Sequence, residues 1–216
     1  YLEGGAIAAN PGMAQELRQA LVEFKESGKW VIAYGDSYGK TDYYLSSVAD
    51  SVLLNPEGSV DFSGMASQIM FYKDVMEKLG IKMQVFKVGT YQSAVEPFIA
   101  TEMSDANREQ LTEMLDSTWD ELLAAVSASR GVSKEKLDDY ADRFMDFCQA
   151  DEYVACGMAD TLLYKDGVQA YLKSLTGIDG DDDLNLVTME TMKERLKLNK
   201  MVVDAADKSK VAVYYA

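Results

Sequence analysis

The chain has 216 residues, of which 48% are hydrophobic and 26% are charged, a composition typical of a soluble globular protein with one large domain. Its formal net charge of -15 would repel a phosphate backbone and argues against nucleic acid as a partner. It contains no histidine, which excludes the Ser-His-Asp triad and the Cys-His pair and argues against nearly every common zinc site. There is no run of about 18 apolar residues that could span a membrane.

The first elements are a strand end at Tyr1 to Gly5 and a helix that begins after Asn10. Asn10 is a good N-cap and Pro11 suits the first helical turn. The helix should end at Ser27-Gly28 and bury one apolar stripe. The stripe comprises Met13, Leu17, Ala20, Leu21 and Phe24.

Short apolar runs then alternate with amphipathic segments up to Val88. The predicted elements are a strand at Trp30 to Tyr34, a helix at Asp42 to Ala49, a strand at Ser51 to Leu54, a helix at Ser67 to Leu79 and a strand at Ile81 to Val88. Such alternation predicts an α/β fold with a mainly parallel sheet covered by helices. The loops Gly35 to Thr41 and Gly89 to Pro97 would then lie at the same carboxyl edge of the sheet.

The remainder is mainly helical. Predicted helices span Ser104 to Arg130, Ser133 to about Phe144, Asp160 to Leu175 and Thr188 to Leu198. The first has an apolar face made of Leu111, Met114, Leu115, Trp119, Leu122, Leu123 and Val126. Val211 to Tyr215 reads as a new strand, so we expect a domain over residues 1–205, and a linker with the first strand of a further domain over residues 206–216.

Two groups of potential metal ligands are interpreted as structural: an acidic segment and the two cysteines. Asp179, Asp181, Asp183, Asn185, Val187 and Glu190 match a calcium-loop spacing. Leu184 replaces the glycine that the sharp turn needs, so a solvated acidic loop is favoured and no metal site is predicted. Cys148 and Cys156 are too few for a metal cage and read as buried thiols, with a disulfide as the alternative in an oxidising compartment.

Without histidine, a serine nucleophile would need a lysine base whose pKa burial has lowered. The candidates near the sheet edge are Ser37, Lys40, Ser59, Ser63, Lys87, Gln92 and Ser93. No pairing among them is specific by spacing. The segment Val88 to Phe98 is the best candidate for displaying chemistry, because it opens with Gly89 and ends at Glu96-Pro97, where proline should keep Glu96 extended.

Several segments resemble bacterial signal peptide peptidase A, or protease IV. They are Asn55 to Gly58, Phe71 to Lys73, Lys78 to Ile81, Val88 to Phe98 and Met103-Ser104. The resemblance implies a crotonase-like (ClpP-like) domain with a helical C-terminal extension. In double-length members, the amino-terminal domain supplies a lysine base and the carboxyl-terminal domain supplies the serine nucleophile. This chain resembles the amino-terminal domain.

Two positions depart from the family pattern. The family's lysine belongs between Tyr91 and Ser93, where this chain has Gln92, which cannot act as a base near pH 7. The place of the nucleophile, before Tyr43-Tyr44, is occupied by Lys40-Thr41-Asp42. Either Gln92 is an introduced inactivating change or the protein is a natural member that has lost activity.

The resemblance implies a Ser-Lys peptidase that degrades cleaved signal peptides without a cofactor, inactive as this chain alone. Gln92 would mark the catalytic position, with Gly89, Tyr91, Ser93, Glu96 and Ser63 in substrate-binding or supporting roles. The partners would be peptide substrates, the carboxyl-terminal half and a homo-oligomer, expected as a tetramer on the outer, periplasmic face of the bacterial cytoplasmic membrane. The alternatives are a non-catalytic scaffold or peptide-binding domain of the same fold and, by fold analogy alone, an enzyme acting on acyl-CoA.

Overall fold

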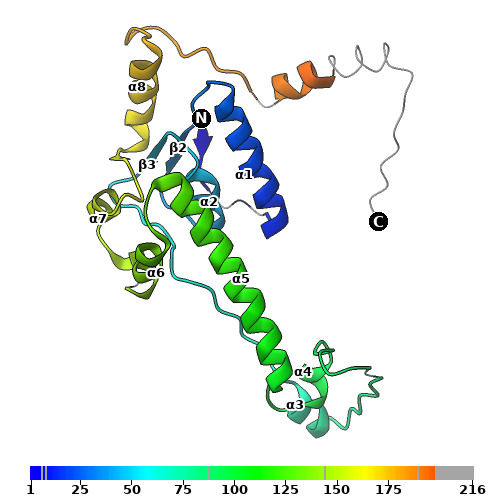
Figure 1. Cartoon of the computed structure of the whole chain (residues 1–216). Helices are drawn as coiled ribbons and strands as arrows, with labels where there is room; N and C mark the ends of the chain where they lie inside the picture. Colours follow the sequence, from blue (N-terminus) through cyan, green and yellow to red (C-terminus); the bar gives the residue numbers. More distant parts are fainter. Residues whose placement is uncertain (6, 8, 87, 144, 189, 198–216) are drawn as a thin grey trace. The chain divides into compact units, whose positions relative to one another are not determined.

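The computed structural model describes residues 1–5, 7, 9–86, 88–143, 145–188 and 190–197 (Figure 1). The first elements alternate as β1 (Leu2–Glu3), α1 (Pro11–Glu26), β2 (Ile32–Gly35), α2 (Lys40–Ser46) and β3 (Ser51–Leu54). The next are α3 (Lys73–Lys78), α4 (Glu96–Ile99), α5 (Asp105–Arg130), α6 (Lys134–Asp142), the 3-10 turn η1 (Met145–Phe147) and α7 (Ala150–Ala155). They are followed by β4 (Thr161–Leu162) and α8 (Lys165–Thr176), and residues 190–197 are also helical.

The chain divides into two compact units, Tyr1–Val168 and Gln169–Ala216. The sheet and the buried core belong to the first unit. The second unit contains the rest of α8 and the helical residues 190–197. The predicted boundary at residues 205 and 206, and the predicted strand Val211 to Tyr215, lie outside the described residues.

The sheet has four strands in the order β1-β2-β3-β4, and each neighbouring pair is parallel. Its centre is the pair β2 and β3, in which Ala33 lies opposite Val52 and Tyr34 opposite Leu53. These four side chains are essentially inaccessible to solvent, as expected for parallel strands covered on both faces. The α/β class with a parallel sheet is therefore confirmed.

Helix α1 begins where the sequence predicts, because the side chain of Asn10 accepts a 2.9 Å hydrogen bond from the backbone N–H of Met13. Its buried face was predicted wrongly. Ala14 and Arg18 are the buried residues, whereas Met13, Leu17 and Phe24 of the predicted stripe are exposed. Arg18 is preferred inside because its guanidinium reaches Ser47 Oγ at 2.9 Å and Ala125 O at 2.5 Å, which connects α1 to the C-terminal end of α2 and to α5.

A chain of aromatic rings connects the carboxyl end of β2 to α5. Tyr38 contacts Tyr43 with ring centroids 6.1 Å apart, and Tyr43 contacts Phe62 at 5.9 Å. Phe62 in turn lies 5.2 Å from Trp119 of α5. The Tyr43 hydroxyl donates to the carbonyl of Met158 at 2.8 Å, so this buried polar group is satisfied. Burial raises the pKa of Tyr43 above its ordinary value.

Helix α5 has the predicted ends: Ser104 caps its first turn, and Gly131 closes it in the left-handed conformation at φ 67°. Only the carboxyl-terminal half of its predicted apolar face is fully covered. Leu122, Leu123 and Val126 are buried in the core, whereas Met114 is 55% exposed. Figure 1 shows α3 and α4 at the opposite end of this long helix from the sheet.

The segment from Ser67 to Val88, which precedes α4, differs from its prediction. The helix predicted from Ser67 begins only at Lys73, and its apolar residues Val75 and Leu79 are exposed. The strand predicted at Ile81 to Val88 was wrong, since residues 81–86 and 88 lie outside helices and strands. A short apolar run becomes a strand only where a neighbouring strand pairs with its backbone.

The part after α6 contains elements that periodicity missed. Thr161–Leu162 forms β4 beside β3, where a helix from Asp160 was predicted, so α8 starts only at Lys165. Helix α7 was not predicted and has a capping box between Gln149 and Glu152. Among the described residues, no helix is long and apolar enough to cross a membrane.

Candidate active-site loop

The loop around Gln92 is closed by its own side chain. The backbone N–H of Val88 donates to Gln92 Oε1 at 2.8 Å. Gly89, between them in sequence, has φ 91°, a conformation that favours glycine. Gln92 itself is exposed. The side chain at the predicted base position is therefore accessible from solvent, while its amide oxygen is used to hold the turn.

Glu96 anchors this loop to the start of α5. Its side chain is buried and accepts from Ser104 Oγ at 2.5 Å, from Ser104 N at 3.3 Å and from Asn107 Nδ2 at 2.9 Å. A carboxylate at a helix N-terminus is also favoured by the helix dipole. The expectation that Pro97 keeps Glu96 extended was wrong, because Glu96 is the first residue of α4 and Pro97 occupies its first turn. Proline fits there since the first-turn N–H groups have no helical partner.

Two more predicted residues join the same end of α5. Tyr91 donates its hydroxyl to Glu109 Oε2 at 3.1 Å, and this hydrogen bond raises the pKa of Tyr91. Ser93 Oγ lies 3.4 Å from Gln110 Oε1. The segment from Gly89 to Glu96 thus lies beside the start of α5, whereas Ser63, predicted for the same site, contacts Lys40 and Asp61 instead.

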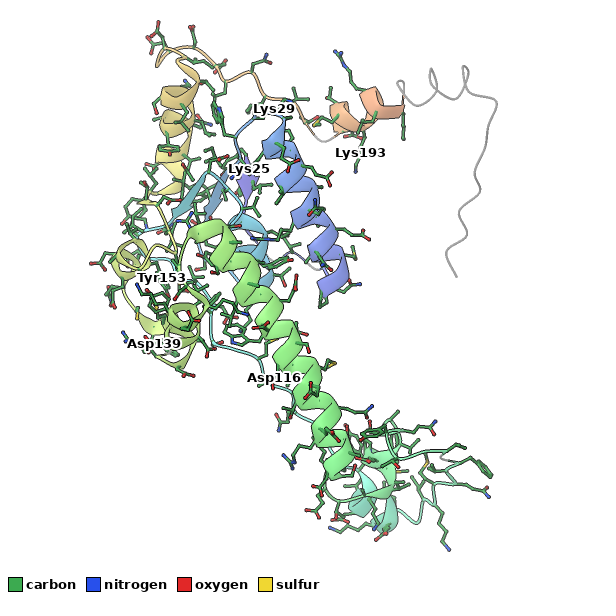
Figure 2. All side chains as sticks on the ribbon, in the orientation of Figure 1. Lys25, Lys29, Asp116, Asp139, Tyr153 and Lys193 are labelled. Atoms are coloured by element: carbon green, nitrogen blue, oxygen red, sulfur yellow. The ribbon has the colours of Figure 1, made fainter. Side chains whose placement is uncertain are left out.

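This loop does not lie at the carboxyl edge of the sheet, where it was expected. Its partner Gln110 precedes the buried Leu122 by twelve residues of α5, which corresponds to about 18 Å along the helix at 1.5 Å per residue. Asp116, labelled in Figure 2, marks the middle of α5 between these two regions. The correction follows from the missing strand, because residues 81–86 and 88 do not bring the loop to the sheet.

At the sheet edge the structure brings together a lysine and a serine. Lys40 Nζ donates to Ser63 Oγ at 2.9 Å and pairs with Asp61 Oδ1 at 2.6 Å, and Ser63 Oγ donates to the same Asp61 oxygen at 2.8 Å. Partial burial acts to raise the pKa of Asp61, but the hydrogen bonds from Lys40 and Ser63 outweigh it, and the pKa is lowered.

This pair lacks the arrangement of a Ser-Lys dyad. Lys40 Nζ contacts a carboxylate and the serine at once, and Ser63 Oγ donates its own proton to the same Asp61 oxygen. Asp61 therefore makes Lys40 and Ser63 a charge-paired structural cluster. Asp61 was not identified from the sequence; its only signal was its position between the candidates Ser59 and Ser63.

Among the other serine candidates, Ser37 is engaged with the backbone. Ser37 Oγ donates to Asp36 O at 2.8 Å and accepts from the N–H of Ser59 at 3.4 Å. Beside them, Asp36 accepts from the Tyr34 hydroxyl at 2.7 Å and from Asn55 Nδ2 at 2.9 Å, and the Tyr34 bond is the main cause that lowers the pKa of Asp36. Lys87 lies outside the described residues.

The cysteines and the acidic loop have no catalytic arrangement. Cys148 and Cys156 pack, partly buried, against the core. Cys156 is a thiol that donates to Tyr153 O at 3.5 Å, and burial raises its pKa, so it is a poor nucleophile. The aspartates at 179 and 181–183 are exposed. In the part of the chain that the structure describes, no group of three or more acidic or cysteine side chains is arranged to hold a metal ion.

Comparison with known proteins gives a family match and several relatives. The sequence profile of Peptidase family S49 matches residues 23–179. Protease 4 of Salmonella typhi is 42% identical over 139 residues, which is 64% of this chain and 22% of that protein. Protease 4 of Haemophilus influenzae is 37% identical over 145 residues, or 67% of this chain and 23% of that protein.

A plant relative covers more of the chain. The chloroplastic serine protease SPPA of Arabidopsis thaliana is 27% identical over 187 residues, 87% of this chain and 27% of that protein. The chain thus spans about a quarter of the length of these relatives. The family match covers most of the chain, including strands β2, β3 and β4, helix α5 and the Gln92 loop. This protein therefore belongs to peptidase family S49 and has its crotonase-like (ClpP-like) fold.

Proposed function

We propose that this chain is the amino-terminal half of a membrane-associated serine peptidase that degrades cleaved signal peptides. In this arrangement the Val88 to Phe98 loop is the base-bearing loop of a Ser-Lys dyad, and a following repeat carries the serine. Gln92 occupies the position of the base, so the chain by itself is inert. The observation that carries the proposal is the exposure of Gln92 in a loop that buried Glu96 attaches to α5.

The chemistry explains why Gln92 abolishes catalysis. A lysine with a lowered pKa can accept the serine proton, and the alkoxide-like serine oxygen then attacks the peptide carbonyl. The lysine later gives the proton to the leaving amine. A carboxamide has no basic lone pair at neutral pH and cannot take this proton. The Lys40 ammonium does not replace it, because Lys40 is paired with Asp61.

The remaining assignments follow from the same proposal. Gly89, Tyr91, Ser93 and Glu96 support the position at residue 92, and Ser63 lies near the substrate at the sheet edge. The protein assembles as a homo-oligomer, a tetramer by the resemblance, on the periplasmic face of the cytoplasmic membrane. Exposed apolar side chains in the segment before α5 support assembly; they include Met70, Val75, Leu79, Phe86 and Val88.

The test is to restore the base in the full reading frame that encodes this chain. Gln92→Lys and the length-matched control Gln92→Met are compared with the starting protein in hydrolysis of a quenched fluorescent peptide. We expect activity only with lysine, increasing by at least about a hundredfold, the scale of general-base catalysis. Equal hydrolysis by all three proteins would show that residue 92 is not the base position.

A second candidate is a non-catalytic peptide-binding or scaffold domain of the same fold. The observation that favours it is the same Gln92, since a binding domain needs no base. It predicts that Gln92→Lys changes neither peptide affinity nor hydrolysis. Measuring both quantities on the same protein separates the two functions.

A further inference from the structure

A cavity of about 380 Å³ opens at the carboxyl edge of the sheet, beside the Lys40 cluster. It lies between the first turns of α1 and α2 and the middle of α5. The lining residues are Pro11, Gly12, Ala14, Gln15, Lys40, Thr41, Tyr44, Met65, Ser117, Thr118, Glu121 and Leu122. Loops that follow the strands of an open parallel sheet are where ligands bind in such folds.

The lining indicates what would fit. The inner surfaces come from Ala14, Tyr44, Met65 and Leu122, which are apolar or aromatic. Ser117 and Glu121 are exposed polar residues of the rim. The volume is at the small end of the range for ligand pockets, about 300 to 1,000 Å³. An apolar side chain attached to a polar backbone matches this combination better than a large cofactor does.

One face of α5 connects the cavity to the Gln92 loop. Gln110, which Ser93 contacts, is followed at helical spacing by Met114, Ser117 and Glu121. Residues at these spacings share a face of a helix. Gln110 and Ser117 are about 10 Å apart along the axis, the length of about three residues of an extended peptide. Met114, between them, is 55% exposed, so this face offers an accessible apolar side chain.

We propose that this cavity binds an apolar side chain of an extended peptide substrate whose backbone runs along this face of α5 toward the Gln92 loop. The inference rests on the proposed function, because it adds a specificity subsite to it. The occupant is a peptide with apolar and basic residues. The apolar side chain fills the cavity, and Glu121 favours neighbouring lysines on a chain of net charge -15, since Lys40, the basic residue of the lining, is paired with Asp61.

The probe is a fluorescein-labelled heptapeptide of alternating leucine and alanine between terminal lysines, and a matched peptide has serine in place of leucine. Fluorescence anisotropy measures the binding of each to this chain. Thr118→Trp fills the cavity from a half-buried lining position on α5. We expect it to weaken binding of the leucine peptide by about tenfold or more and to remove the preference for leucine over serine, the scale on which an apolar pocket discriminates by one side chain.

The matched control is Thr112→Trp, which adds the same ring at an exposed position of α5 that neither lines the cavity nor shares the helix face of Gln110, Met114 and Ser117; it should leave the affinity unchanged. If thermal unfolding shows that Thr118→Trp does not fold, the same binding measurement is made with Ser117→Trp, which places the ring at the rim of the cavity. Equal affinities for the leucine peptide in the starting chain, the cavity variant and the control would overturn the inference, as would equal affinities for both peptides.

The same substitutions in the full reading frame with Gln92→Lys separate the subsite from the proposed function. A higher KM for the leucine peptide with unchanged kcat in the cavity variant supports the subsite. Hydrolysis with an unchanged KM would refute the subsite and leave the peptidase standing. Hydrolysis of neither peptide would refute the proposed function, and the anisotropy measurement on this chain would still decide whether the cavity binds apolar side chains.

Discussion

Glu96 is the residue whose removal should release the candidate active-site loop without unfolding the sheet. In Glu96→Ala the loop loses its buried acceptor at the start of α5. Ser104 and Asn107 then lose their partner. Asn107 is only 3% exposed, so water cannot readily replace the carboxylate at its amide.

The structure sets the size of the effect. A hydrogen bond to a charged group contributes about 1.5 to 3 kcal/mol, and a buried amide left without a partner costs about 1 to 3 kcal/mol. We expect the free energy of opening this region to fall by about 3 kcal/mol, because α4 can shift and admit some water. A fall of about 3 kcal/mol corresponds to an opening equilibrium constant raised by about a hundredfold.

Hydrogen exchange of backbone amides measures this opening directly. The reporters are the amides of Ala100, which donates to Glu96 O at 2.9 Å, and of Tyr72, which donates to Pro97 O at 2.6 Å. Both should exchange about a hundredfold faster in the variant. The amide of Val52 in the central strand, which pairs with Asp160 Oδ2 at 2.7 Å, should keep its rate.

Glu102→Ala is the matched control, since it removes an equal charge from an exposed position a few residues later. It should leave the exchange of Ala100 and Tyr72 unchanged. If Glu96→Ala and Glu102→Ala give the same rates, the anchoring of the loop by Glu96 is refuted. If Val52 is accelerated as strongly as Ala100, the anchor contributes to global stability and the loop does not open by itself.

Two further predictions concern the sheet. Partial burial acts to raise the pKa of Asp160, but the hydrogen bonds that it accepts from Arg130 outweigh burial and lower the pKa. The ionised Asp160 therefore stabilises the fold above about pH 4, its ordinary pKa in the unfolded chain. This stabilisation is lost as the pH falls through the lower pKa of the folded protein. Asp160→Asn should reduce the free energy of unfolding at pH 7 by about 1 to 2 kcal/mol, a value reduced for solvent screening, and flatten its acid dependence in urea titrations. Gly58→Ala should lower it by about 2 kcal/mol or more, because the added Cβ would overlap the carbonyl oxygen of Asp36.

Each of these has a control in the same unit. Asp116→Asn removes an exposed carboxylate of α5 and should leave the acid dependence intact; a slope equal to that of Asp160→Asn would contradict the role of the ion pair. Gly5→Ala places a Cβ where no atom lies within 4 Å. Equal stability of the two alanine variants would show that the backbone at Gly58 can move away without loss.

Much of the loop could be predicted from the sequence because its signals are local. Gly89 marks a left-handed turn, and Ser104 marks the start of α5. The role of Glu96 could not be read this way. Its partner Asn107 lies eleven residues away in sequence, and nothing in the pattern indicates that a glutamate before a proline is buried.

The sequence by itself determined the parallel α/β class, the caps of α1 and α5 and the grouping of Gly89, Tyr91, Gln92, Ser93 and Glu96 in one loop, since these depend on residues close together in the chain. The tertiary structure decided which faces are buried and which segments pair. It placed Arg18 inside and left Phe24 exposed, formed a strand at Thr161–Leu162 and none at residues 81–86. These outcomes depend on partners distant in sequence, which supply the acceptors and the strand neighbours that an apolar pattern alone does not encode.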